Sequence, residues 1–157
     1  MLSSSFWIGM IAAGAVLVAI SNIQYNRVRE FENKQSKANQ VRELLRPEIQ
    51  RNVHILAQMR VALNAQSVRI ETFDTTAWQT VSGSDLLFGL PNNELSALMQ
   101  AYRLMNRANT LHAKILDSSI GMASALSGSE KTRGLFMNDL ASALQQLEPL
   151  MNSLLGK

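Results

Sequence analysis

The feature that most constrains this chain is an uninterrupted apolar block near its start. From Phe6 to Ile20 the sequence FWIGMIAAGAVLVAI contains no charged residue, and only Gly and Ala separate its large apolar side chains. As a helix this block rises about 22 Å, and an extension from Leu2 to Ile23 gives about 33 Å. Because the hydrocarbon layer of a bilayer is about 30 Å thick, the block predicts a transmembrane helix within residues 1–24.

Two other interpretations of the block stay open. A cleaved signal peptide has a basic segment before its apolar region, but no Lys or Arg precedes Phe6. The small-x-small sequence Ala13-Gly14-Ala15 would also leave a very short apolar region before the cleavage site. A helix buried in the core of a soluble protein is the other alternative. An uncleaved span is the expectation that accounts best for the length and flanks of the block.

The residues that flank the block predict its orientation. Trp7 and Tyr25 lie where interfacial aromatic residues belong. Basic residues follow only on the C-terminal side, namely Arg27, Arg29, Lys34 and Lys37. The positive-inside rule therefore predicts an N-terminus outside and a cytoplasmic remainder, with a periplasmic or extracellular remainder as the alternative. The same basic residues are expected to contact anionic lipid headgroups.

Small residues within the block are spaced for close packing of helices. Gly9 with Ala13, and Ala15 with Ala19, form two small-xxx-small pairs. This spacing is typical of surfaces that pack on another transmembrane helix. It predicts contact with another membrane protein and is compatible with a homo-oligomer, although Gly and Ala are also common in spans that do not pair.

Beyond the block, the chain predicts helices with short breaks. Residues 25–40 are almost entirely polar, which favours a solvated helical stalk. Three later stretches carry apolar residues at helical spacing, and the phase continues through Pro47 and Pro149. The stripes are Val41, Leu45, Ile49, Val53, Leu56, Met59 and Leu63; Leu95, Leu98, Tyr102, Met105, Ala108, His112 and Ile115; and Phe136, Leu140, Leu144, Leu147, Met151 and Leu154.

The breaks complete the predicted architecture. Residues 72–91 predict an insert of short helices, which Ser82-Gly83-Ser84 divides and Pro91 ends. The stretch SALSGSEKTRG, residues 124–134, predicts the turn between the last two long helices. The chain is therefore expected to be all-α, with an N-terminal transmembrane helix, a stalk, and a small antiparallel bundle over residues 41–157.

Composition and spacing exclude several kinds of site. The 157 residues include no Cys, which rules out disulfides, thiolate metal sites and a cysteine nucleophile. The net charge of +3 is too small to indicate nucleic acid as a partner. His54 and His112 would form a metal or proton site only if both met Glu48 or Asp117, and no metal-binding spacing supports this. No metal, cofactor or catalytic residue is expected.

Three aromatic residues are candidates for contact with a partner protein. Trp78, Phe88 and Tyr102 belong to the residue types that dominate interface hot spots. Large aromatic residues on short helices more often close the open end of a small bundle, so a core role is the favoured interpretation.

Two segments together resemble a pattern found in uncharacterised prokaryotic single-pass membrane proteins. The segments are LLRPEIQRN and TTAWQTVSGSDLLFGLPNNELSALMQAYRLMNRAN. The resemblance covers roughly residues 6–115 and rests on Leu44, Leu45, Glu48, Ile49, Asn52, Trp78, Leu90, Pro91 and Tyr102. It implies an N-terminal span followed by a small helical domain, and it implies no established activity.

These observations predict a membrane-anchored interaction module without enzymatic activity. An accessory or structural subunit of a larger membrane complex is the most concrete form of this prediction. The alternative is a single-pass sensor whose bundle lies on the extracytoplasmic side and binds a small ligand between its helices.

Overall fold

The computed structural model describes residues 4–65, 71–121 and 128–156, and it describes side chains in 16–65, 71–117 and 131–156. The elements in these ranges are helices α1 (Ser4–Asn64), α2 (Thr76–Ser82), α3 (Asn92–Gly121) and α4 (Gly128–Leu155), with a 3-10 helix η1 (Asp85–Gly89). None of the described residues forms a β-strand. The chain is all-α, as its sequence predicts.

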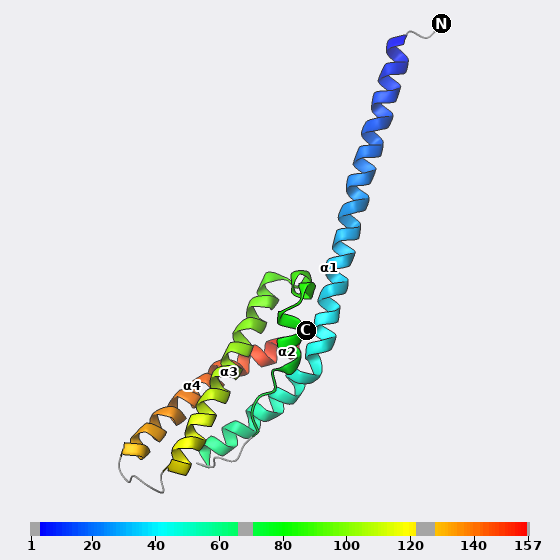
Figure 1. Cartoon of the computed structure of the whole chain (residues 1–157). Helices are drawn as coiled ribbons and strands as arrows, with labels where there is room; N and C mark the ends of the chain where they lie inside the picture. Colours follow the sequence, from blue (N-terminus) through cyan, green and yellow to red (C-terminus); the bar gives the residue numbers. More distant parts are fainter. Residues whose placement is uncertain (1–3, 66–70, 122–127, 157) are drawn as a thin grey trace.

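Helix α1 is 61 residues long and continues through Pro47. Proline removes one backbone N–H donor and clashes with the carbonyl one turn earlier, which bends a helix without ending it when packing holds both sides. Figure 1 shows that α1 is straight in its N-terminal half and changes direction within the half that joins the bundle. The helix therefore continues through Pro47, as the unbroken apolar phase predicts.

The other helices fold back on the C-terminal half of α1. The insert with α2 and η1 returns along α1, α3 then runs parallel to that half of α1, and α4 returns antiparallel to both (Figure 1). Helix α4 packs on α3 and on α1, and the C-terminus lies beside the middle of α1. The domain is a helical bundle in which α4 runs antiparallel to α1 and α3.

The core includes most residues of the predicted stripes, one additional row on α1, and buried residues of the insert such as Phe73, Val81 and Leu90. Buried residues of the stripes are Val41, Leu45, Ile49, Leu56 and Met59 of α1; Leu98, Tyr102, Met105, Ala108, His112 and Ile115 of α3; and Leu140, Leu144, Leu147 and Met151 of α4. On α1, a second row of Glu48, Asn52 and Ile55 is also buried. The insert packs against this row and buries it. The predicted stripe allowed for contact with the other long helices only, so the buried face of α1 is wider than predicted.

One predicted turn is wrong. Helix α4 already begins at Gly128, so the sequence GSEKTRG at 128–134 is helical and only the residues before it connect α3 to α4. Gly134 lies within the helix and costs about 1 kcal/mol relative to Ala, which the packed remainder of α4 outweighs.

The N-terminal half of α1 projects away from the bundle (Figure 1). Residues 16–36 are exposed, and burial begins with Lys37 and Ala38, where η1 contacts α1. Lys37 and Ala38 therefore belong to the packed part, although they fall in the stretch expected to be a stalk.

Across the part of α1 and the other helices with described side chains, no segment is long and apolar enough to cross a membrane. The predicted span falls largely on residues 1–15, whose side chains lie outside the described part. The same holds for Trp7, Gly9, Ala13 and Ala15.

Candidate functional site

A buried carboxylate, that of Glu48, joins three helices. Its side chain accepts hydrogen bonds from the backbone N–H groups of Ala77 (2.5 Å) and Trp78 (3.2 Å) and from the hydroxyl of Tyr102 (2.6 Å). The first N–H groups of a helix have no partner within the helix, and the side chain of Thr75 at the N-cap makes no capping bond. Glu48 therefore caps α2 from another helix.

Two asparagines hold the extended segment that leads into α2. Asn52 of α1 accepts from the N–H of Asp74 (2.8 Å) and donates to its carbonyl (2.6 Å). Asn109 of α3 makes the same pair of bonds with Phe73, at 2.8 and 2.9 Å. A side-chain amide can bond both the backbone N–H and the backbone carbonyl of one residue in this way. The extended segment therefore has its backbone groups paired, as they would be in a sheet.

Two of the three aromatic candidates lie together in the interior. The rings of Trp78 and Tyr102 are stacked, with centroids 4.7 Å apart and planes inclined by 7°. Tyr102 is only 1% exposed. Burial, and then the hydrogen bond to Glu48, raise the pKa of Tyr102 well above its ordinary value, so its phenol is neutral. Phe88, on η1, is instead 80% exposed.

Alkaline pH is expected to destabilise the bundle through Tyr102. Because folding raises its pKa, this residue contributes its full stability below the ordinary value of 10.0, and the contribution is lost as the pH rises through the higher folded pKa. Between the ordinary value of 10.0 and the higher folded pKa, the free energy of unfolding should fall by up to about 1.4 kcal/mol per pH unit from this group. Tyr102→Phe has no phenol to titrate, so its stability should depend less steeply on alkaline pH. Equal slopes for wild type and variant in chemical denaturation would contradict the assignment.

Ion pairs also connect the insert and α3 to α1. Arg42 binds Glu94 with two bonds, Nε to Oε1 at 2.9 Å and Nη2 to Oε2 at 2.7 Å. The side chain of Glu94 is 6% exposed, and its hydrogen bond raises the pKa of Arg42. Lys37 pairs with Asp85 at the start of η1, at 2.6 Å. The bidentate pair fixes the beginning of α3 against α1.

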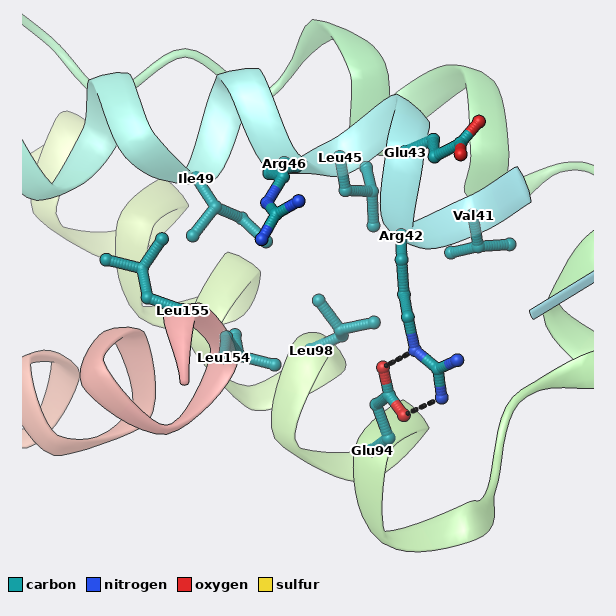
Figure 2. Close-up of a pocket in the computed structure, with 10 residues that line it drawn as sticks. All are labelled: Val41, Arg42, Glu43, Leu45, Arg46, Ile49, Glu94, Leu98, Leu154 and Leu155. Carbon is teal, nitrogen blue, oxygen red and sulfur yellow. Dashed lines mark hydrogen bonds and ion pairs between the residues drawn. The ribbon is translucent and has the colours of Figure 1, made fainter. Parts of the chain in front are cut away.

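A pocket lies next to this bidentate pair. It has a volume of about 140 Å³ and is bounded by the middle of α1, the start of α3 and the end of α4. Figure 2 shows the Arg42–Glu94 pair at one side and Ile49, Leu154 and Leu155 at the other.

The remaining sequence candidates are spread over the molecule. Tyr25, Arg27, Arg29 and Ala19 are exposed on the projecting half of α1. His54 is exposed and contacts Gln58, whereas His112 is buried in the bundle. Among the described residues no three His, Asp or Glu side chains are grouped to hold a metal ion.

The polar groups around Glu48 bind one another and hold the fold together. The oxygens of Glu48 are occupied by three donors from within the fold, and Tyr102 keeps its proton. These groups position the aromatic stack and the insert.

Sequence reasoning missed several of these contacts. Asn52 was singled out by the resemblance without a role, and Glu48 by the resemblance and as a possible partner of the histidines in a metal or proton site. Asn109 and the Arg42–Glu94 pair were not singled out. Nor was Gly89, where an added Cβ would lie 2.6 Å from the carbonyl oxygen of Lys34 on α1. For Glu48 and Asn52 the sequence offered one indication: they are spaced four apart, on the same side of the helix as the apolar Ile55.

Comparison with protein family models, curated protein sequences and solved structures found no significant match for this chain.

Proposed function

We propose that this protein is a membrane-anchored interaction module, an accessory subunit that joins a helical bundle to another membrane protein. The observation that carries the proposal is the continuity of α1, which runs from the apolar block into the bundle as one helix. The five consecutive residues 16–20 are all apolar and therefore cover every side of this helix, and the four large ones (Val16, Leu17, Val18 and Ile20) are each at least 47% exposed. A helix that is apolar all round requires apolar surroundings, and lipid would supply them.

The continuous helix would hold the bundle at a set distance from the bilayer. Residues 24 and 37 are separated by about 20 Å along a helix, so lipid ending near Tyr25 would leave the bundle about that far above it. Arg27 and Arg29 would then lie at headgroup level, and their charge favours a cytoplasmic bundle. A single helix also transmits rotation or displacement of the span to the bundle without a hinge.

The surface best suited to a partner lies where α1 leaves the bundle. Phe88 is almost fully exposed on η1, and its neighbour Gly89 contacts the backbone of α1 at Lys34 and Ala38. Phe31, one turn before Lys34, is 66% exposed. Exposed aromatic side chains are costly in water and typical of interface hot spots.

Replacing Phe88 tests the contact with a partner. Phe88→Ser should change the free energy of unfolding by no more than about 0.5 kcal/mol, because the ring packs on little. The same change should release the partner during purification in mild detergent. Met99→Ser is the matched control, because Met99 is exposed on α3 and should leave the partner bound. Retention of the partner by Phe88→Ser would contradict a role for this residue.

Topology tests the anchoring itself. A C-terminal epitope tag should stay with the membrane after carbonate washing, survive protease in spheroplasts, and be cut in inverted vesicles. Cleavage in spheroplasts would place the bundle on the extracytoplasmic side and favour the ligand-binding sensor. Release by carbonate would contradict the membrane anchor.

A further inference from the structure

The pocket between α1, α3 and α4 has an apolar interior. Six of its ten lining residues are aliphatic, and they come from all three helices: Val41, Leu45, Ile49, Leu98, Leu154 and Leu155. Its volume of about 140 Å³ is close to that of engineered apolar cavities, about 150 Å³, that take up benzene. The pocket therefore suits an apolar group of about six to eight heavy atoms.

The charges on the rim favour an anion of single charge. Arg42 is neutralised by Glu94 through two hydrogen bonds. Arg46, one turn further along α1, forms no ion pair with any residue of the described ranges. Figure 2 shows the guanidinium of Arg46 directed towards the pocket beside Ile49, whereas the carboxylate of Glu43 is directed away. One positive charge is thus left facing the pocket.

We propose that this pocket binds a monocarboxylate with a small apolar body, of the class that includes hexanoate and benzoate. The apolar body contacts the aliphatic walls, and the carboxylate accepts hydrogen bonds from Arg46. The planar guanidinium matches a carboxylate in a bidentate geometry. A phosphate dianion would leave one charge without a partner beside apolar walls. A neutral hydrocarbon would gain no hydrogen bond from Arg46, which is exposed and solvated.

The test is a titration of the full chain in lipid nanodiscs with hexanoate, followed by NMR of leucine methyl groups. Saturable shifts with a Kd on the order of 1 mM or below are expected for a ligand of this size. 1-Hexanol, which has the same apolar body without the charge, should bind at least about tenfold more weakly. Saturable binding of both with equal affinity, or of neither, would overturn the proposal.

Two variants locate the site. Arg46→Gln should weaken hexanoate binding at least about tenfold and leave the melting temperature unchanged, because Arg46 is exposed. Leu154→Trp should fill the pocket and abolish binding. Arg103→Gln is the control, since Arg103 is an exposed arginine of α3 that does not line the pocket. Unchanged binding by Arg46→Gln or by Leu154→Trp would contradict the assigned site, whatever the role of the bundle at the membrane.

Discussion

Replacing Glu48 with alanine is expected to lower the free energy of unfolding by about 3–5 kcal/mol, because one buried and two half-buried donors lose their acceptor. The donors are the N–H groups of Ala77 and Trp78 and the hydroxyl of Tyr102. The two N–H groups belong to the first turn of α2, where the helix offers no replacement. Because Trp78 and Tyr102 are stacked, loosening of either should reduce the near-ultraviolet circular dichroism together with stability.

Chemical denaturation of the full chain in mild detergent measures this effect. Glu48→Gln retains one carbonyl oxygen, and we expect a smaller loss of about 1–2 kcal/mol. Glu43→Ala is the matched control, because Glu43 is exposed on the same helix and should cost no more than about 0.5 kcal/mol. A loss below about 1 kcal/mol for Glu48→Ala would mean that water or another side chain replaces the cap.

Helical periodicity accounts for the part of the fold that could be predicted from the sequence. The stripe on α3 and the stripe on α4 each face one continuous core, so their spacing identifies most of the buried residues. It missed Leu104 and Leu111 of α3, which are buried beside the stripe. Pro47 and Pro149 could be placed inside helices because the apolar phase is the same on both sides of each. The turn at 124–134 was predicted too long because its Gly and Ser residues are typical of turns, whereas α4 already begins at Gly128.

The candidate site could be predicted only in part, because its contacts join residues far apart in the chain. Glu48 meets Ala77 and Tyr102 across 29 and 54 positions, and no local pattern encodes such a pairing. A polar residue on a buried row indicates that a partner exists without saying which one. Asn109 gave no signal of its own, because it lies beside the apolar stripe of α3 and its partner is the backbone of Phe73.

Nothing in the sequence marks Gly89 as important, yet we expect it to tolerate substitution less well than Gly83. In the sequence it reads as an ordinary turn residue before Leu90 and Pro91. In the fold, a Cβ at this position would lie 2.6 Å from the carbonyl oxygen of Lys34 and 2.8 Å from the backbone nitrogen of Ala38. Neither atom belongs to a flexible side chain, so α1 and η1 must separate to accept even one methyl group.

Gly89→Ala should therefore lower the free energy of unfolding by about 3 kcal/mol or more, and hydrogen exchange should show where the loss occurs. Amides around Ala38 and Leu90 should exchange faster, whereas those of the α3–α4 contact should keep their protection relative to global unfolding. Gly83→Ala is the matched control, because a Cβ there meets no atom within 4 Å, and its φ of −87° suits alanine. Equal effects of the two substitutions would mean that the contact of η1 with α1 yields freely. The position of the bundle on α1 would then depend on its other contacts, among them the bidentate Arg42–Glu94 pair and the packing of α4 on α1.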